Sequence, residues 1–158
     1  MWKVLGIIIL LVVAIQFARP SRSNPASAPE KSLVAQMHPP AEVQGILARS
    51  CNDCHSNLTR WPWYSGIAPF SWIVSDDVRD GRRHLNFSLW EDYEQGKRAK
   101  LLARICEETR DGGMPLWAYT VVHRGTALSR PERDQVCHWT ASERATAGAS
   151  AQLPQTAH

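Results

Sequence analysis

The residues best suited to chemistry are two cysteines three positions apart with a histidine directly after the second, in Cys51-Asn52-Asp53-Cys54-His55. Such a group can serve as a disulfide, a redox-active dithiol, half of a zinc site, or the attachment point of a haem. Haem attachment needs two thiols at a fixed separation, which add across the two vinyl groups, and an imidazole beside them that binds the iron. Cys51, Cys54 and His55 meet these requirements.

The other three uses each leave something unexplained. A redox dithiol is expected within a βαβ unit, and no stretch of this sequence alternates in polarity as a strand does. A zinc site needs two further ligands, for which Cys106 and Cys137-His138 are available without forming a second paired cluster. A plain disulfide gives His55 no role. Because a chance match is expected only about 0.004 times in a chain of this composition, the motif favours one covalent haem c.

An iron bound by His55 has a second axial position, for which Met114 is the first candidate. Met114 lies in Gly112-Gly113-Met114-Pro115, where the glycines allow close backbone approach and the proline stiffens the loop. A thioether opposite histidine raises the reduction potential and suits electron transfer. His84 and His123 are the alternative ligands, and an open position is the third possibility. Without a ligand role, Met114 would fill a gap in the core.

Three segments are predicted to form the helices that position these residues. Residues 41–50 place apolar side chains on one face and lead directly into the cysteine motif. Residues 88–110 and 129–142 each begin with a capping box, at 88–91 and 129–132. The predicted class is all-α, with a small cytochrome c-like domain around the haem.

The ends of the chain are expected to lie outside that domain. Residues 1–18 are almost entirely apolar after a single lysine, which predicts a signal anchor or transmembrane helix, or else a cleaved export signal. A Pro/Ser-rich linker is predicted over 19–40, the haem-binding domain over 41–142, and a disordered tail over 143–158. The protein is therefore expected at the periplasmic face of a bacterial cytoplasmic membrane, or fully exported after cleavage. A net charge of +3 without a basic stripe argues against nucleic acid as a partner.

The order of these features resembles the class I c-type cytochromes, and more closely the bacterial single-haem "haem-binding domain" family of membrane-anchored exported proteins. The resemblance covers roughly residues 42–142 and implies haem binding and electron transfer. Cys106 and Cys137 depart from the family pattern. The residues that carry the resemblance are 51–57, 59–65, 67–72, Asp77-Val78, Gly81-Arg82, 85–88, Trp90, Met114-Pro115, Tyr119, His123, Leu128-Ser129 and Trp139.

Several further side chains are candidates for contact with the cofactor. Arg60 and Arg82, with Arg83 beside them, suit the haem propionates because guanidinium groups match carboxylates, although each can equally be a surface charge. Trp61 and Trp63 can line the pocket or form a purely structural core.

Cys106 and Cys137 fall on the inner faces of the second and third predicted helices. In an oxidising compartment two spare cysteines tend to pair. A disulfide and a pair of buried thiols both remain open.

The function predicted from these residues is one-electron transfer by a membrane-anchored monohaem c-type cytochrome that meets redox partner proteins. No nucleophile with its base, carboxylate pair or phosphate loop is present in the sequence, which favours a carrier over an enzyme. A haem-based gas or redox sensor, or a peroxidase-like protein with a labile sixth ligand, is the second hypothesis. A structural haem subunit of a redox complex is the third. The sequence does not indicate the oligomeric state.

Overall fold

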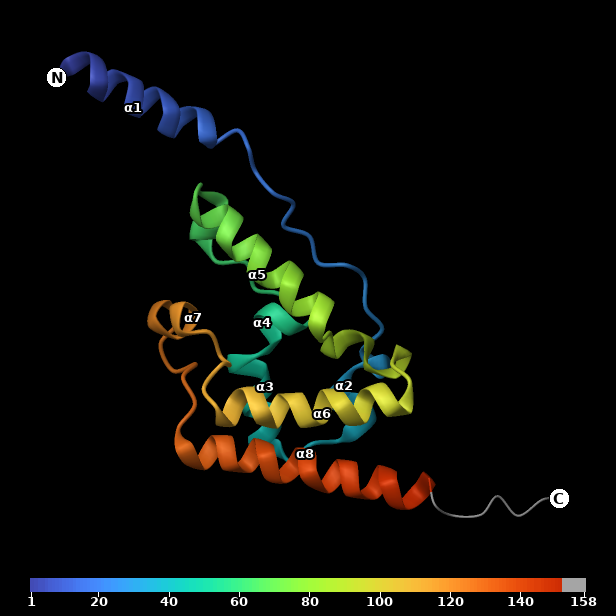
Figure 1. Cartoon of the computed structure of the whole chain (residues 1–158). Coiled ribbons are helices and arrows are strands. Elements are labelled where there is room, and N and C mark those ends of the chain that lie inside the picture. Colours follow the sequence, from blue (N-terminus) through green and yellow to red (C-terminus); the bar gives the residue numbers. More distant parts are fainter. Residues whose placement is uncertain (152–158) are drawn as a thin grey trace.

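The structure is a computed structural model that describes residues 1–151, and its regular elements are all helical (Figure 1). No strand occurs in this range, so the all-α class is confirmed. The α-helices are α1 (Trp2–Ile15), α2 (Leu33–Met37), α3 (Ala41–Ser50), α4 (Asn52–His55), α5 (Phe70–His84), α6 (Gln95–Arg110), α7 (Trp117–Val122) and α8 (Arg130–Ala151). Three 3₁₀ segments, η1 (Pro29–Lys31), η2 (Trp63–Gly66) and η3 (Phe87–Asp92), lie between them.

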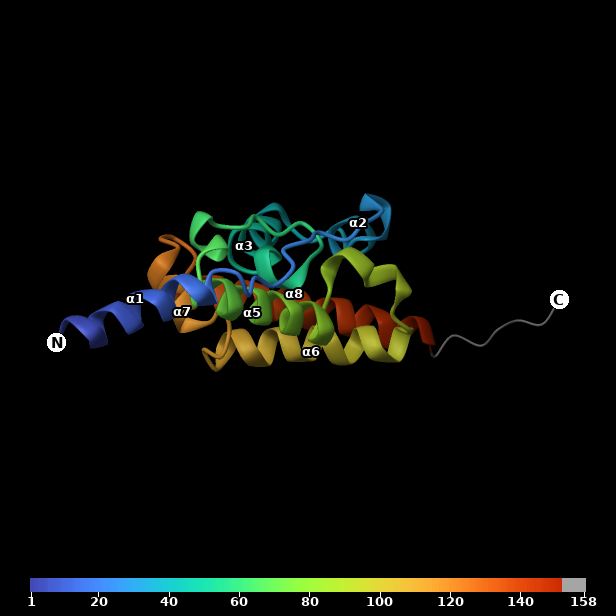
Figure 2. The same ribbon diagram turned by 90° about the horizontal axis from the view of Figure 1, so that it is seen from above.

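The core is built on α6 and α8, which run side by side in opposite directions, with α3 packed against α8 (Figures 1 and 2). One face of α3 is fully buried there because its apolar residues recur at helical spacing. The last residue of α3 is followed directly by Cys51, so the core fixes the entry to the cysteine motif. The buried core side chains are Leu33, Val43, Ile46, Leu47, Leu85, Phe87, Trp90, Leu102, Ile105, Leu128, Val136 and Trp139.

The predicted helix at 41–50 is confirmed with both of its ends. The capping box before α8 is also confirmed, since the amide and hydroxyl of Ser129 both donate to Glu132 Oε2 at 2.8 Å. The predicted end at residue 142 is wrong, because α8 continues to Ala151. The disordered tail predicted over 143–158 is therefore helical as far as 151, and residues 152–158 lie outside the described range.

The second predicted helix begins later than expected. Residues 87–92 form η3, the chain is extended at Tyr93 and Glu94, and α6 starts at Gln95. The capping box at 88–91 is wrong because the Ser88 hydroxyl accepts from the amide of Asn57, a residue of the haem motif region. The local pattern assigned the Ser88 side chain to a helix cap, but this side chain instead makes a long-range hydrogen bond to Asn57.

The sequence analysis missed α5 and α7. The buried face of α5 consists of Ser71, Ser75, Val78 and Gly81, so small and polar residues occupy the inward positions and the apolar periodicity of a core helix is absent. α7 is short and has no buried residue. It therefore lacks the buried apolar face whose periodicity predicts a helix.

The linker predicted over 19–40 is wrong for its second half. Leu33 is completely buried in the core, and α2 packs against η3. The first half is also held against the domain, since Asn24 donates to the Thr59 carbonyl at 2.9 Å and Arg22 donates to the Ser65 hydroxyl at 3.3 Å. The segment therefore runs along the domain.

α1 is the helix predicted at the N-terminus, and none of its side chains is buried. It projects from one end of the molecule (Figure 1). Across residues 1–151, none of the helices combines the length and the apolar character needed to cross a bilayer.

The structure joins Cys106 of α6 to Cys137 of α8 in a disulfide, which is the first of the two alternatives left open by the sequence. The bond ties together the two longest helices of the core. Replacing both cysteines with alanine is expected to lower the free energy of unfolding by about 3–4 kcal/mol, from the entropy of a closed loop with a separation of 31 residues. Urea denaturation measures this change. Wild-type protein reduced with dithiothreitol should lose a similar amount, and an unchanged midpoint would contradict the prediction.

Candidate functional site

The three residues of the cysteine motif lie within one helical turn and directly before it. Cys51 precedes α4, and its carbonyl accepts from the amides of Cys54 and His55 at 3.3 and 3.0 Å. The hydrogen bonds to the Cys51 carbonyl therefore keep the three residues of the motif close together.

The imidazole of His55 is held by two backbone carbonyls. Nδ1 lies 3.1 Å from the carbonyl oxygen of Gly81 and 3.1 Å from that of Leu85. Both oxygens are acceptors, so Nδ1 carries the proton and Nε2 keeps its lone pair. Burial lowers the pKa of His55, which favours the neutral ring. A neutral imidazole fixed through its Nδ1–H is the usual form of a metal-binding histidine.

α5 reaches this site by a close backbone approach at Gly81. A Cβ atom on Gly81 would lie 2.6 Å from the carbonyl oxygen of Cys54, so only glycine fits between the two helices. The same residue supplies one carbonyl to His55. The ring centroid of Phe87 lies 6.0 Å from that of the His55 imidazole, and the two ring planes are inclined by 40°. Phe87 therefore lies beside the imidazole.

A buried network of polar side chains holds the segment that carries Leu85 and Phe87. Asn86 Nδ2 donates to Asn57 Oδ1 at 2.8 Å, and the amide of Ser88 donates to Asn86 Oδ1 at 3.0 Å. Asn57 and Asn86 are 3 and 5 % exposed, so these bonds satisfy groups that water does not reach. The network connects the residues after His55 to the residues that orient its ring.

The two thiols of the motif are free, and burial is the main reason that their pKa values are high. The pKa of Cys51 is raised to about 12 and that of Cys54 to about 11, the latter also by the nearby Asp77 and Asp53. Redox dithiols and zinc thiolates depend on a lowered pKa. In addition, Cys106 and Cys137, the further thiols that a zinc site would use, are joined to each other. The raised pKa values are unlike those of a redox dithiol, and the disulfide removes Cys106 and Cys137 as ligands of a zinc site.

The carboxylate of Asp53, inside the motif, connects three parts of the chain. Its Oδ1 accepts from the backbone amide and the Nε of Arg60, at 3.1 and 3.2 Å. Its Oδ2 accepts from the hydroxyl of Tyr119 at 2.9 Å. Because Tyr119 belongs to α7, the carboxylate holds the segment after Met114 against the cysteine motif.

Removing this hydroxyl tests the role of the carboxylate. Tyr119→Phe is expected to lower the free energy of unfolding by about 1.5–3 kcal/mol, since the hydrogen bond to the Asp53 carboxylate is lost. The same hydroxyl also lies 3.4 Å from the Arg49 carbonyl oxygen. Urea denaturation followed by circular dichroism measures the change. Thr120→Ala, on the same helix with only a local bond to the Trp117 carbonyl, is the control, and equal losses in the two variants would contradict a special role for Tyr119.

The structure brings two of the other predicted site residues, Arg60 and Arg82, to the motif, and both already make hydrogen bonds within the chain. Arg60 is paired with Asp53. Arg82 donates to the carbonyls of Ser56 and Ser23 and to the side chains of Asn24 and Thr59, at 2.8–3.0 Å. It therefore fastens the N-terminal segment to the end of α4.

The two predicted tryptophans occupy different environments. Trp61 is half-buried and donates from Nε1 to Asn24 Oδ1 at 3.1 Å. Trp63 is 81 % exposed and makes an edge contact with Tyr64. Trp117, on α7, is 78 % exposed. Both of these large apolar side chains therefore lie at the surface of the protein.

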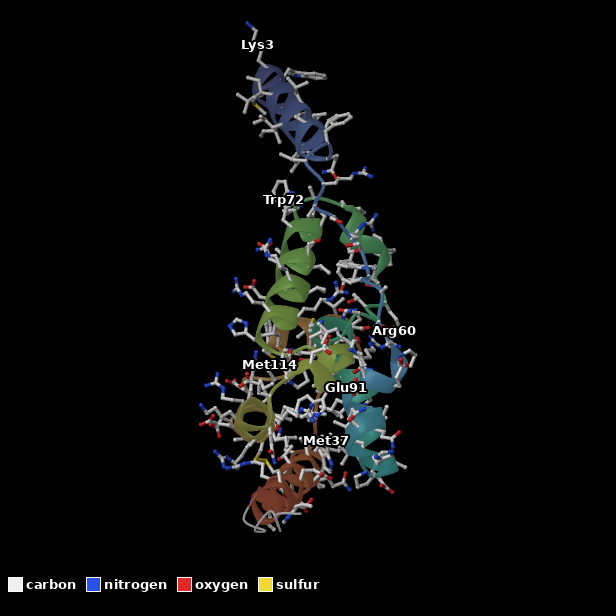
Figure 3. All side chains as sticks on the ribbon, turned by 90° about the vertical axis from the view of Figure 1, so that its right-hand side faces the viewer. Lys3, Met37, Arg60, Trp72, Glu91 and Met114 are labelled. Atoms are coloured by element: carbon white, nitrogen blue, oxygen red, sulfur yellow. A yellow bond between two sulfur atoms is a disulfide. The ribbon has the colours of Figure 1, made fainter. Side chains whose placement is uncertain are left out.

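The candidates for a second axial ligand differ in how far they are already engaged. His123 donates from Nδ1 to the Tyr119 carbonyl and accepts at Nε2 from the Tyr64 hydroxyl, so both of its nitrogens are used. His84 is exposed and donates from Nδ1 to the Asp80 carbonyl. The side chain of Met114 is half-buried, beyond the end of α6 (Figure 3). Its amide donates to the Glu108 carbonyl, which fixes the start of the loop.

Sequence reasoning overlooked the roles of Asp53, Gly81 and Tyr119. Gly81 and Tyr119 are among the residues that carry the family resemblance, so that pattern held a signal for them. Asp53 sits between the two cysteines, at a position that the motif itself leaves open. Its role follows only from the contacts that Arg60 and Tyr119 make in space.

One of three comparisons with known proteins gave a match. A search of curated proteins and a search of solved structures each gave no match. A family model described as the haem-binding domain matches residues 10–142, which is most of the chain and includes the whole site. The chain belongs to the haem-binding domain family.

Proposed function

We propose that this protein is an exported c-type cytochrome that carries one electron at a time between redox partner proteins. Cys51 and Cys54 would form thioether bonds to a single haem, and His55 Nε2 would bind its iron. The observation that supports this most directly is the pair of carbonyls on His55 Nδ1, which leaves the lone pair of Nε2 available in the residue directly after Cys54. A bound haem supplies a reversible one-electron couple.

The chain contributes the positioning of that group. The Gly81 and Leu85 carbonyls hold the imidazole and strengthen its donor character. The Asp53 carboxylate keeps α7 against the motif, and the exposed Trp63 and Trp117 supply apolar surface for a macrocycle. Arg60 remains a candidate for the propionates, because it is exposed apart from its pair with Asp53.

Met114 is proposed as the second axial ligand, since His123 uses both nitrogens within the protein and His84 is exposed. Met114→Ala is expected to abolish the weak long-wavelength band of the oxidised holoprotein and to lower its reduction potential. Absorption spectra and a redox titration measure both effects. His123→Ala serves as the comparison: if it removes the band and Met114→Ala does not, the histidine is the ligand.

Membrane attachment through residues 1–18 is also proposed. Apart from Lys3 near its start, α1 carries only apolar side chains, and none of them is buried. A helix that is apolar on all sides is stable only when a hydrophobic environment surrounds it. The haem domain would then lie on the periplasmic face, or in the exported fraction if the segment is cleaved.

The proposal is tested with protein made in cells that carry a cytochrome maturation system. The expected product stains for haem on a denaturing gel, gives the pyridine haemochrome of a haem with two thioether bonds, and is reduced and reoxidised without peroxide consumption. A colourless product would reject haem attachment. Rapid carbon monoxide binding to the reduced protein would instead favour the gas sensor or peroxidase-like alternative, which needs a labile sixth ligand.

A further inference from the structure

Exposed apolar side chains gather at the root of α1. Phe17 is 85 % exposed, and Ile67, Phe70, Trp72 and Ile73 are between 36 and 55 % exposed. We call these five residues the root face. The face begins where α1 ends and continues onto the first turns of α5.

The segment that supplies most of the root face contains no charged side chain. Residues 61–75 contain no Asp, Glu, Lys, Arg or His, and the first charged residues of α5 are Asp76 and Asp77. From Asp76 onward the exposed surface of α5 carries ion pairs, such as Arg79 with Asp76 and Arg83 with Asp80. The first turns of α5 therefore expose apolar side chains, and the turns after Ser75 expose charged ones.

Two side chains tie α1 to this face. Gln16 donates to the carbonyl of Ala68 at 3.2 Å and accepts from the amide of the same residue at 3.0 Å. Trp72 donates from Nε1 to the carbonyl of Ala18 at 2.6 Å. Trp72 lies at the base of α1 in Figure 3, and α1 leaves the molecule from this end in Figures 1 and 2.

We propose that the root face rests on the lipid bilayer into which α1 inserts, so that the haem domain sits on the membrane in one orientation. This inference rests on the proposed membrane attachment of residues 1–18. The surface that surrounds the base of an inserted helix is necessarily the surface nearest the lipid. An uncharged patch with tryptophan and phenylalanine suits the interfacial layer, where aromatic side chains are enriched. Arg19, shortly after the end of α1 at Ile15, supplies a cation for lipid headgroups.

The orientation has a consequence for the haem site. α5 begins at the root face and reaches the His55 ring with its last turn, through Gly81. Phe70 and Gly81 are 11 positions apart, which corresponds to about 16 Å at the rise of an α-helix. α5 would therefore act as a spacer that holds the haem motif at a set height above the bilayer, within reach of a membrane-bound partner.

The test uses the full-length holoprotein in nanodiscs of phosphatidylcholine and phosphatidylglycerol that contain a photoactivatable phospholipid. Lipid adducts are mapped by mass spectrometry after illumination. We expect adducts in peptides from α1 and in peptides covering 67–73, and none around Leu58, which is 63 % exposed but outside the root face. Phe70→Ser with Ile73→Ser should reduce the adducts at 67–73 several-fold while those in α1 persist. Leu58→Ser is the matched control and should change neither.

Three results would overturn the proposal. Adducts confined to α1 would show that the root face does not touch lipid, although the attachment itself holds. Adducts absent from α1 as well would reject the membrane attachment on which the inference rests. Two chains per nanodisc with cross-links between their 67–73 segments would show that a second copy covers the face. The haem content, measured on the same samples, reports separately on the proposed cytochrome.

Discussion

Replacing Cys51 and Cys54 together with alanine is expected to reduce haem staining on a denaturing gel to background. The thioether bonds are the only links proposed to survive denaturation, and both thiols are free in the structure. The pyridine haemochrome spectrum of the purified variant should likewise lose the bands of a covalently attached haem. Each single replacement leaves one sulfur, so an intermediate yield with a shifted haemochrome band is expected.

Alanine at Cys106 and Cys137 is the matched control for this experiment. It removes the same number of sulfur atoms from another part of the fold, where the disulfide joins α6 and α8. We expect this variant to be less stable but to stain for haem at the level of the wild type per molecule of protein. Retained staining in the Cys51/Cys54 variant, or lost staining only in the Cys106/Cys137 variant, would contradict the proposed attachment.

Gly81→Ala is expected to have the second largest effect. The added methyl group would lie 2.6 Å from the Cys54 carbonyl oxygen, so α5 and α4 must separate. Overpacking of this kind lowers the free energy of unfolding by about 1–3 kcal/mol. Because the Gly81 carbonyl also holds His55 Nδ1, the yield of haem-loaded protein should fall as well. Urea denaturation and the ratio of haem absorbance to protein measure the two effects.

Gly45→Ala separates this clash from the general effect of alanine in a helix. Gly45 lies within α3, and nothing comes within 4 Å of a Cβ placed there. Alanine is favoured over glycine inside a helix by about 1 kcal/mol, so this variant should be as stable as the wild type or more so. If Gly81→Ala behaved in the same way, the close approach of α5 to the motif would be refuted.

Local patterns in the sequence predicted the parts of the fold in which neighbouring residues decide the outcome. α3 has its apolar residues at helical spacing and was predicted with both of its ends. The capping box before α8 formed because Ser129 and Glu132 need only each other. The end of α8 was placed too early, because its last turns carry too few apolar residues to continue the pattern.

Long-range contacts decided those parts of the fold that the local sequence patterns did not predict correctly. Ser88 has the sequence environment of a helix cap, but its hydroxyl accepts from the Asn57 amide instead. α5 turns serines and a glycine inward, because it must lie close to the backbone of α4 rather than fill a wide core. The predicted linker contains Leu33, whose burial depends on the partners that α2 meets in η3.

The sequence by itself determined the helical class and the haem-binding family, because helical periodicity and the spacing of Cys51, Cys54 and His55 depend only on residues close together in the chain. Only the tertiary structure decided which atoms hold His55, how Asp53 joins Arg60 to Tyr119, and where α1 stands relative to the motif. These contacts join residues up to 66 positions apart. Such pairs come together only when packing of the whole chain brings their elements side by side.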